Sequence, residues 1–136
     1  MVRDGDTAFL NVDLDIWSRS PLDPLVAALG RRVLVLHVGK ERQRYSAHLE
    51  LASSGSRPSA DRIIHKFVDL ITRLPRSARA LWNRAEIREF NVGIQAGARP
   101  FSYGLLLEPT TLAGMARVNA RLGFTVYGAG GAVTIE

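Results

Sequence analysis

Three polar residues near the N-terminus share one face of an alternating segment. Asn11, Asp13 and Asp15 occupy every second position between apolar residues, the period of a strand with one buried face. Carboxylates at this spacing could hold Mg²⁺ through oxygen ligands, as a metal-dependent hydrolase centred on Asp13 and Asp15 would require. Any solvated strand face also has polar residues at this spacing, so an ordinary surface is the simpler interpretation. We therefore predict no metal site and no cofactor.

The histidines, His37, His48 and His65, could be ligands or general bases, since neutral imidazole serves both purposes. In the hairpin register predicted below, His37 lies opposite Arg44 and His48 opposite Val33, which is too far apart to share one ion. His65 lies near the edge of a helical apolar stripe. The pattern favours partly buried structural histidines.

Motifs for nucleophilic catalysis and for phosphate binding are missing from the sequence. The chain has no cysteine and no Gly-x-Ser-x-Gly segment. The glycine-rich segment 128–131 follows a predicted strand, but no helix N-terminus follows it to complete a phosphate cradle. We predict no catalytic residue, and the sequence favours a protein that is not an enzyme.

A cluster of arginines surrounds Trp82 in a chain of net charge +5. Its members are Arg73, Arg76, Arg79, Arg84 and Arg88. Such a surface could bind RNA or single-stranded DNA by phosphate contacts and stacking, although no Lys/Arg-Gly-Phe-Gly-Phe run of the RNA-recognition fold occurs. All but two of the 18 basic residues are arginine, and alanine and glycine are abundant, as expected from coding DNA rich in G and C. Trp82 beside Leu81 also fits a core anchor.

The segment from Gly97 to Tyr103 has the composition of an interaction loop. Glycine and proline shape it, and Arg99 and Tyr103 are of types enriched at interface hot spots, with Phe101 as a further aromatic. We predict that Arg99, Phe101 and Tyr103 bind a partner protein. The alternative is that Phe101 and Tyr103 pack into the core at the start of the next strand.

The first half of the chain predicts a strand, a helix and a hairpin. Residues 7–16 form the strand, with Ala8, Leu10, Val12, Leu14 and Ile16 on its buried face. Ser20 and Pro21 begin a helix that Gly30 ends. Runs 32–38 and 44–51 pair as a hairpin in which Val38 lies opposite Gln43.

The second half predicts two helices, two strands, a third helix and a last strand. Ser59 caps a helix over 60–74, a short helix covers 77–85, and strands follow over 86–96 and 103–108. A helix begins at Pro109 and stops at Gly123, and 124–127 form the last strand. The segments from Phe9 to Gly39 and from Phe101 to Gly128 therefore make a loose β-α-β pseudo-repeat.

These elements predict one α+β domain over residues 1–136. We expect a two-layer sandwich in the ferredoxin-like style, in which helices cover one face of a mostly antiparallel sheet and residues 1–6 and 129–136 fray. No apolar run is long enough to span a membrane, and the first seven residues contain no apolar core of a secretory signal, so we expect a cytoplasmic protein.

The order of these elements resembles a family of small bacterial domains of unknown function. The residues that carry the resemblance are Leu29-Gly30, Phe90 to Gln95, Leu107, Leu122-Gly123 and Thr125 to Tyr127. A tryptophan that such domains tend to carry soon after the first helix is replaced here by His37 and Val38. The resemblance implies a small cytoplasmic protein without an assigned activity, in some members with a toxin–immunity setting.

Three hypotheses about function follow. The leading one is a small non-catalytic binding domain that recognises another protein, as an immunity protein does, through Arg99, Phe101 and Tyr103 with the acidic strand face as a second patch. The second is a nucleic-acid-binding domain that uses the arginine cluster. The third is a metal-dependent hydrolase that uses Asp13 and Asp15.

Overall fold

The computed structural model describes residues 5–56 and 58–128. Among them the strands are β1 (Ala8–Ser18), β2 (Val33–Glu41), β3 (Arg44–Leu51), β4 (Ile87–Gln95) and β5 (Arg121–Tyr127). The helices are α1 (Asp23–Leu29), α2 (Ala60–Thr72), α3 (Arg76–Arg84) and α4 (Pro109–Arg117), with a 3-10 turn at Gly30–Arg32. Of the ends expected to fray, 1–4 and 129–136 lie outside the described residues, whereas Asp6 forms a β-bridge with Arg99.

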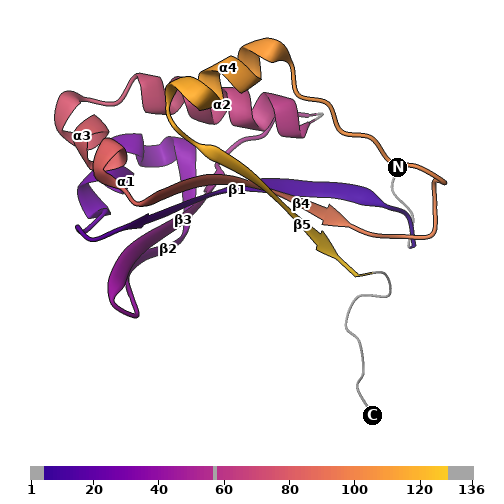
Figure 1. Cartoon of the computed structure of the whole chain (residues 1–136), viewed down its shortest axis with the longest axis horizontal. Coiled ribbons are helices and arrows are strands. Elements are labelled where there is room, and N and C mark those ends of the chain that lie inside the picture. The colour runs from indigo at the N-terminus through magenta and orange to yellow at the C-terminus, as the bar shows by residue number, and fades with distance from the viewer. Residues whose placement is uncertain (1–4, 57, 129–136) are drawn as a thin grey trace.

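The strands form one mixed sheet in the order β2-β3-β1-β4-β5. All neighbouring strands are antiparallel except β4 and β5, which are parallel and joined through α4. The helices lie on one side of the sheet, and no element of the described residues covers the other, bare side (Figure 1). The predicted α+β architecture is therefore confirmed. Within the described residues, no helix has the length and apolar character needed to cross a membrane.

The core lies between the sheet and the helix layer. Val12, Leu14 and Ile16 of β1 are fully buried, as their alternation predicts. The apolar stripe of α2 packs against them, and the Ser59 side chain caps this helix by accepting a hydrogen bond from the Arg62 amide. The buried Trp82 indole donates a 2.9 Å hydrogen bond to the Val118 carbonyl, which confirms that Trp82 is a core anchor.

The first turn of α1 differs from the sequence prediction. The helix begins at Asp23, its N-cap position is Leu22, and no side chain caps it. Ser20 and Pro21 therefore lie before the helix, and Pro24 stands in its first turn. Gly30 ends the helix at a φ of 62°, as predicted.

A β-bulge in β1 means that the predicted buried face of this strand is wrong at Leu10. The register with β4 shifts between Phe9 and Asn11. Because a bulge inserts one residue, the alternation reverses there: Leu10 is 51% exposed, whereas Phe9 packs against the core.

The β2–β3 hairpin is longer than predicted. Glu41 lies opposite Arg44, so the turn contains only Arg42 and Gln43, and Arg42 adopts a φ of 61°. A second bulge between Val35 and His37 turns Val33 to the core and leaves Leu34 and Leu36 about half exposed. The predicted pairing of Val38 with Gln43 is therefore wrong.

The chain between β4 and β5 also differs from the prediction. Residues 103–108 form no strand and pair with no neighbour in the described sheet, although Leu107 packs against the core and Leu106 is exposed. The left-handed turn after α4 is at Asn119, with a φ of 58°, and Gly123 lies inside β5. The second half of the expected pseudo-repeat thus lacks its first strand.

Candidate functional site

The bare side of the sheet carries most of the polar side chains of the strands. We call it the open face, and its strand register places the following residues on it: Asn11, Asp13, Asp15 and Trp17 of β1; His37 and Glu41 of β2; Arg44, Ser46, His48 and Glu50 of β3; Glu89, Asn91, Gly93 and Gln95 of β4; and Arg121, Gly123, Thr125 and Tyr127 of β5. The predicted polar face of Asn11, Asp13 and Asp15 thus lies at the centre of a larger polar surface.

A histidine and two carboxylates form a group of interacting side chains on the open face. His48 Nδ1 lies 2.8 Å from Asp15 Oδ1, and His48 Nε2 lies 3.2 Å from Glu41 Oε1. Burial alone would lower the pKa of His48, but the hydrogen bonds with Asp15 and Glu41 outweigh it and raise the pKa. The Ser46 hydroxyl donates to Glu41 Oε1, and this bond together with His48 lowers the pKa of Glu41. The Trp17 and His48 rings pack in a T-shaped arrangement with a centroid distance of 5.6 Å.

The expectation that His37 and His48 lie far apart is wrong. They are direct partners across β2 and β3, with ring centroids 5.7 Å apart, because the hairpin register differs from the predicted one. His65, expected to be partly buried, is exposed on α2 near Asp69. Among the described residues, no group of three or more acidic, histidine or cysteine side chains is arranged to hold a metal ion.

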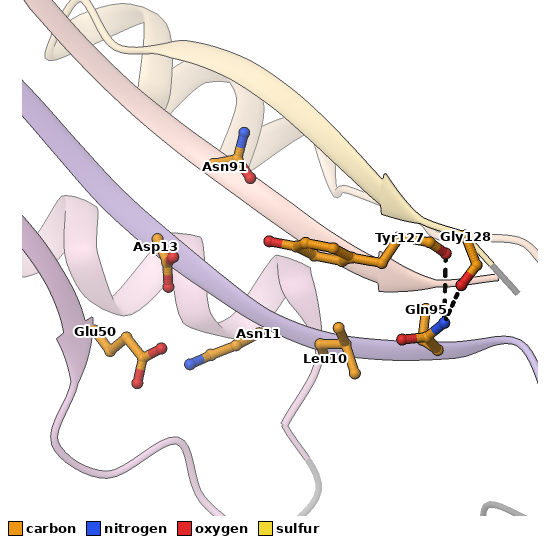
Figure 2. A pocket seen from close by; sticks show the side chains of 9 residues that line it. Leu10, Asn11, Asp13, Glu50, Asn91, Gln95, Tyr127 and Gly128 are labelled. Atoms are coloured by element: carbon orange, nitrogen blue, oxygen red, sulfur yellow. Dashed lines mark hydrogen bonds between the residues drawn. The ribbon is translucent and has the colours of Figure 1, made fainter. Parts of the chain in front are cut away.

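Asp13 and Glu50 stand together in a pocket on the open face. The pocket has a volume of about 480 Å³ and crosses β3, β1, β4 and β5 (Figure 2). The pKa of Asp13 is raised from 3.8 to about 6, first by burial and then by the hydrogen bond and the charge of Glu50. The charge of Asp15 adds to this effect, and His48 opposes it. The Asp13 carboxyl therefore releases its proton at a higher pH than an isolated aspartate would.

The other wall of this pocket comes from β4 and β5. The Tyr127 ring lies along the face and points its hydroxyl end toward Asp13 (Figure 2). The ring passes close to Gly93, where a Cβ would stand 3.8 Å from Tyr127 Cε2, an ordinary contact distance. The Gln95 side-chain amide donates to the carbonyls of Tyr127 and Gly128. The sequence did not identify Glu50, Gln95 and Tyr127 as site residues. Alternation along their strands indicates that they point outward, but it does not indicate which strands lie next to one another in the sheet.

The predicted partner-binding loop begins at Gly97, two residues after the end of β4 at Gln95, and so lies at the same end of the sheet. Phe101 is completely exposed, so it does not pack into the core. Tyr103 is 40% exposed, and its hydroxyl accepts a 2.7 Å hydrogen bond from the Phe9 amide. Arg99 Nε lies 2.8 Å from Asp6 Oδ1. The loop is anchored at Gly97, where any side chain would collide with the backbone at Gly5.

The arginine cluster lies in and beside the helix layer, away from the open face. Arg73, Arg76 and Arg84 are exposed. The Arg88 guanidinium instead donates to the backbone carbonyls at the end of α3 and to that of Asn119. Trp82 is buried, so it cannot stack on a base.

Charge is separated between the two sides of the molecule. Basic residues outnumber acidic ones in the helix layer, where Arg31, Arg32, Arg62, Lys66, Arg73, Arg76, Arg84 and Arg117 are exposed. The open face instead carries the carboxylates of Asp13, Asp15 and Glu50 on its inner strands β1 and β3, and that of Glu41 at the end of the edge strand β2. The arginines of this face stand toward its rim and are paired: Arg44 with Glu86, and Arg121 with Glu89 at 2.7 Å.

Within the described residues, the open face offers carboxylates, amides and aromatic rings around a shallow pocket. This arrangement can bind a cationic or hydrogen-bonding surface, with Asp13 and Glu50 as acceptors at its centre. The chain matches no family model, no curated protein and no solved structure.

Proposed function

We propose that this chain is a small non-catalytic recognition domain that binds the basic surface of another protein with its open face. The observation that carries the proposal is the separation of charge: the centre of the bare sheet face is acidic in a chain whose net charge is +5. Carboxylates that are partly desolvated and already crowded gain most from an approaching cation.

The exposed ring of Phe101 supplies a second element of the binding surface. A completely exposed phenylalanine gains from burial, and aromatic residues are enriched at the centres of protein interfaces. Because its loop starts where β4 leaves the pocket, one partner could contact the loop and the open face together. Arg99 and Tyr103 act at the rim of this contact.

The finer role that we propose is that of an immunity-type protein in the bacterial cytoplasm. An acidic face of this kind would cover the cationic surface with which a toxin binds phosphate groups. Masking of that surface needs no catalytic residue on the inhibitor.

The experiment is affinity capture from the source organism with the wild-type chain and charge-matched variants. Asp13→Asn combined with Glu50→Gln removes two carboxylates from the open face. Asp23→Asn combined with Asp69→Asn removes two from the helix layer. We expect the first pair to abolish capture of a basic protein and the second to leave it unchanged. Equal capture by both would refute a role of the open face.

Two further measurements test the role of the loop and distinguish a protein partner from a nucleic-acid partner. Phe101→Ala should weaken capture without lowering thermal stability, since the ring makes no buried contact. A labelled single-stranded oligonucleotide should not bind at physiological salt. Salt-sensitive oligonucleotide binding that is lost in Arg76→Gln combined with Arg84→Gln would instead favour the nucleic-acid hypothesis.

A further inference from the structure

We propose that β5 pairs with β5 of a second copy of this chain, in an antiparallel arrangement that joins the two sheets across a twofold axis. β5 is an edge strand of the described sheet and pairs only with β4 there. The inference is independent of the proposed function, because it concerns the edge of the sheet and not the open face.

The backbone of β5 presents a regular set of groups to this edge. Tyr127 directs its carbonyl toward β4, where it accepts a 2.9 Å hydrogen bond from the Ala96 amide. Since backbone groups alternate along a strand, Leu122, Phe124 and Val126 direct their amides and carbonyls away from β4. These residues are therefore the ones that a further strand can bond.

The side chains of β5 favour association at this edge. Phe124 is 56% exposed and Val126 is 61% exposed on the helix side of the sheet, where the helix layer does not cover them. Edge strands usually carry a bulge, a proline or a lysine that prevents pairing, and β5 has none of these. The opposite edge, β2, is protected by a bulge after Val35 and by Lys40.

The occupant is a second copy because β5 complements itself. In the antiparallel register centred on Phe124, this residue faces its own copy and Leu122 faces Val126, so apolar side chains meet on the helix side. Each of these pairs is a hydrogen-bonded pair, because their backbone groups point to the edge. On the open face, Arg121 lies opposite Tyr127 of the second copy, and each side chain keeps the contacts of its own chain, Arg121 with Glu89 and Tyr127 in the pocket. No two like charges face each other.

The test is the mass of the full chain in solution, measured by light scattering over about a hundredfold range of concentration, because a dimer populates by mass action. We expect a species of twice the 14.9 kDa chain mass that dissociates on dilution. Phe124→Lys places two like charges on the twofold axis and should weaken association about tenfold or more. Leu112→Lys, at an exposed leucine of α4, is the matched control and should leave association unchanged.

Two further variants address the register and the fold. Val126→Pro removes an amide that points to the edge and spares the pairing with β4, so it should give a folded monomer by circular dichroism. Because the chain has no cysteine, Leu122→Cys and Val126→Cys molecules should form a mixed disulfide when combined, since hydrogen-bonded partners stand about 5.5 Å apart. Neither variant should form a disulfide alone, because like positions lie about 14 Å apart.

A protein that stays monomeric at all concentrations overturns the proposal. It does so even where residues of the same chain protect the Val126 amide. A dimer that survives both Phe124→Lys and Val126→Pro also overturns it. Loss of partner capture without loss of dimerisation would refute only the proposed function, so the two ideas fail separately.

Discussion

Removing the charge of Asp13 should stabilise the protein at neutral pH. The folded state raises the pKa of this carboxyl from 3.8 to about 6, chiefly by burial and by the neighbouring Glu50. Below about pH 4 the carboxyl is protonated in both the folded and the unfolded state, so Asp13→Asn changes little. Between pH 4 and 6 the unfolded state ionises first, and folding becomes less favourable. Above pH 6 the full penalty is present, and the asparagine variant avoids it.

The size of this effect follows from the displacement of the pKa. A rise from 3.8 to about 6 corresponds to about 3 kcal/mol, at about 1.4 kcal/mol for each pH unit. Asp13 remains partly exposed, and solvent screens the repulsion, so we expect about 1 kcal/mol at pH 8. Glu50→Gln should lower the pKa of Asp13 and reduce the pH dependence, because it removes the charge of Glu50 and offers an amide donor to the ionised Asp13.

The assay is urea unfolding of dilute protein between pH 3.5 and 8, followed by circular dichroism. The difference in unfolding free energy between Asp13→Asn and wild type should grow from near zero to about 1 kcal/mol as the pH rises. Asp69→Asn on α2, whose side chain is 54% exposed, is the control for loss of a carboxylate at a solvated position, and at pH 8 it should stabilise the protein less than Asp13→Asn does. A variant that is less stable than wild type at pH 8, or a difference independent of pH, would refute this account of the open face.

Three further changes test other parts of the structure. His48→Gln should remove a stabilisation that wild type holds below pH 6.5 and loses as the pH rises through the raised pKa of His48, so unfolding curves of the two proteins should converge at high pH. Trp82→Phe should lower the unfolding free energy by about 2 kcal/mol, since it leaves the buried Val118 carbonyl without its donor, and urea unfolding measures this loss. Gly114→Ala should lower the melting temperature by several degrees (roughly 1–3 kcal/mol of overpacking), because its Cβ would stand 2.9 Å from Val68 Cγ1 and force α4 away from α2.

The sequence predicts those elements whose signals are local. The alternation of Val12, Leu14 and Ile16 is visible within a few residues, and the Ser59 cap lies next to the helix that it begins. Trp82 was placed in the core from its position beside Leu81. Each of these features depends on neighbours in the chain, so no knowledge of the sheet was needed.

The remaining features depend on contacts between distant segments. The bulges at Leu10 and Leu36 each add one residue to a strand and leave no local signature. Alternation counted through a bulge therefore assigns the residues beyond it to the wrong face of the sheet. The Arg42 turn has no glycine to mark it, and the left-handed residue after α4 is Asn119 and not a glycine.

The candidate site was predicted only in part, for the same reason. Asp13 and Asp15 were found because they share a strand. Glu50 and Tyr127 belong to β3 and β5, which are distant from β1 in the chain. The order of the strands in the sheet brings them to the pocket, and the sequence did not determine this order.

The two-layer architecture has a consequence for how such a chain can change. Successive residues of β1 alternate between the core and the bare surface, so Leu14 holds the fold while Asp13 and Asp15 beside it face solvent. Substitutions at the outward positions can therefore alter specificity with little disturbance of packing, whereas the inward positions tolerate only similar volumes. One scaffold can in this way carry many different outer surfaces while its interior stays constant.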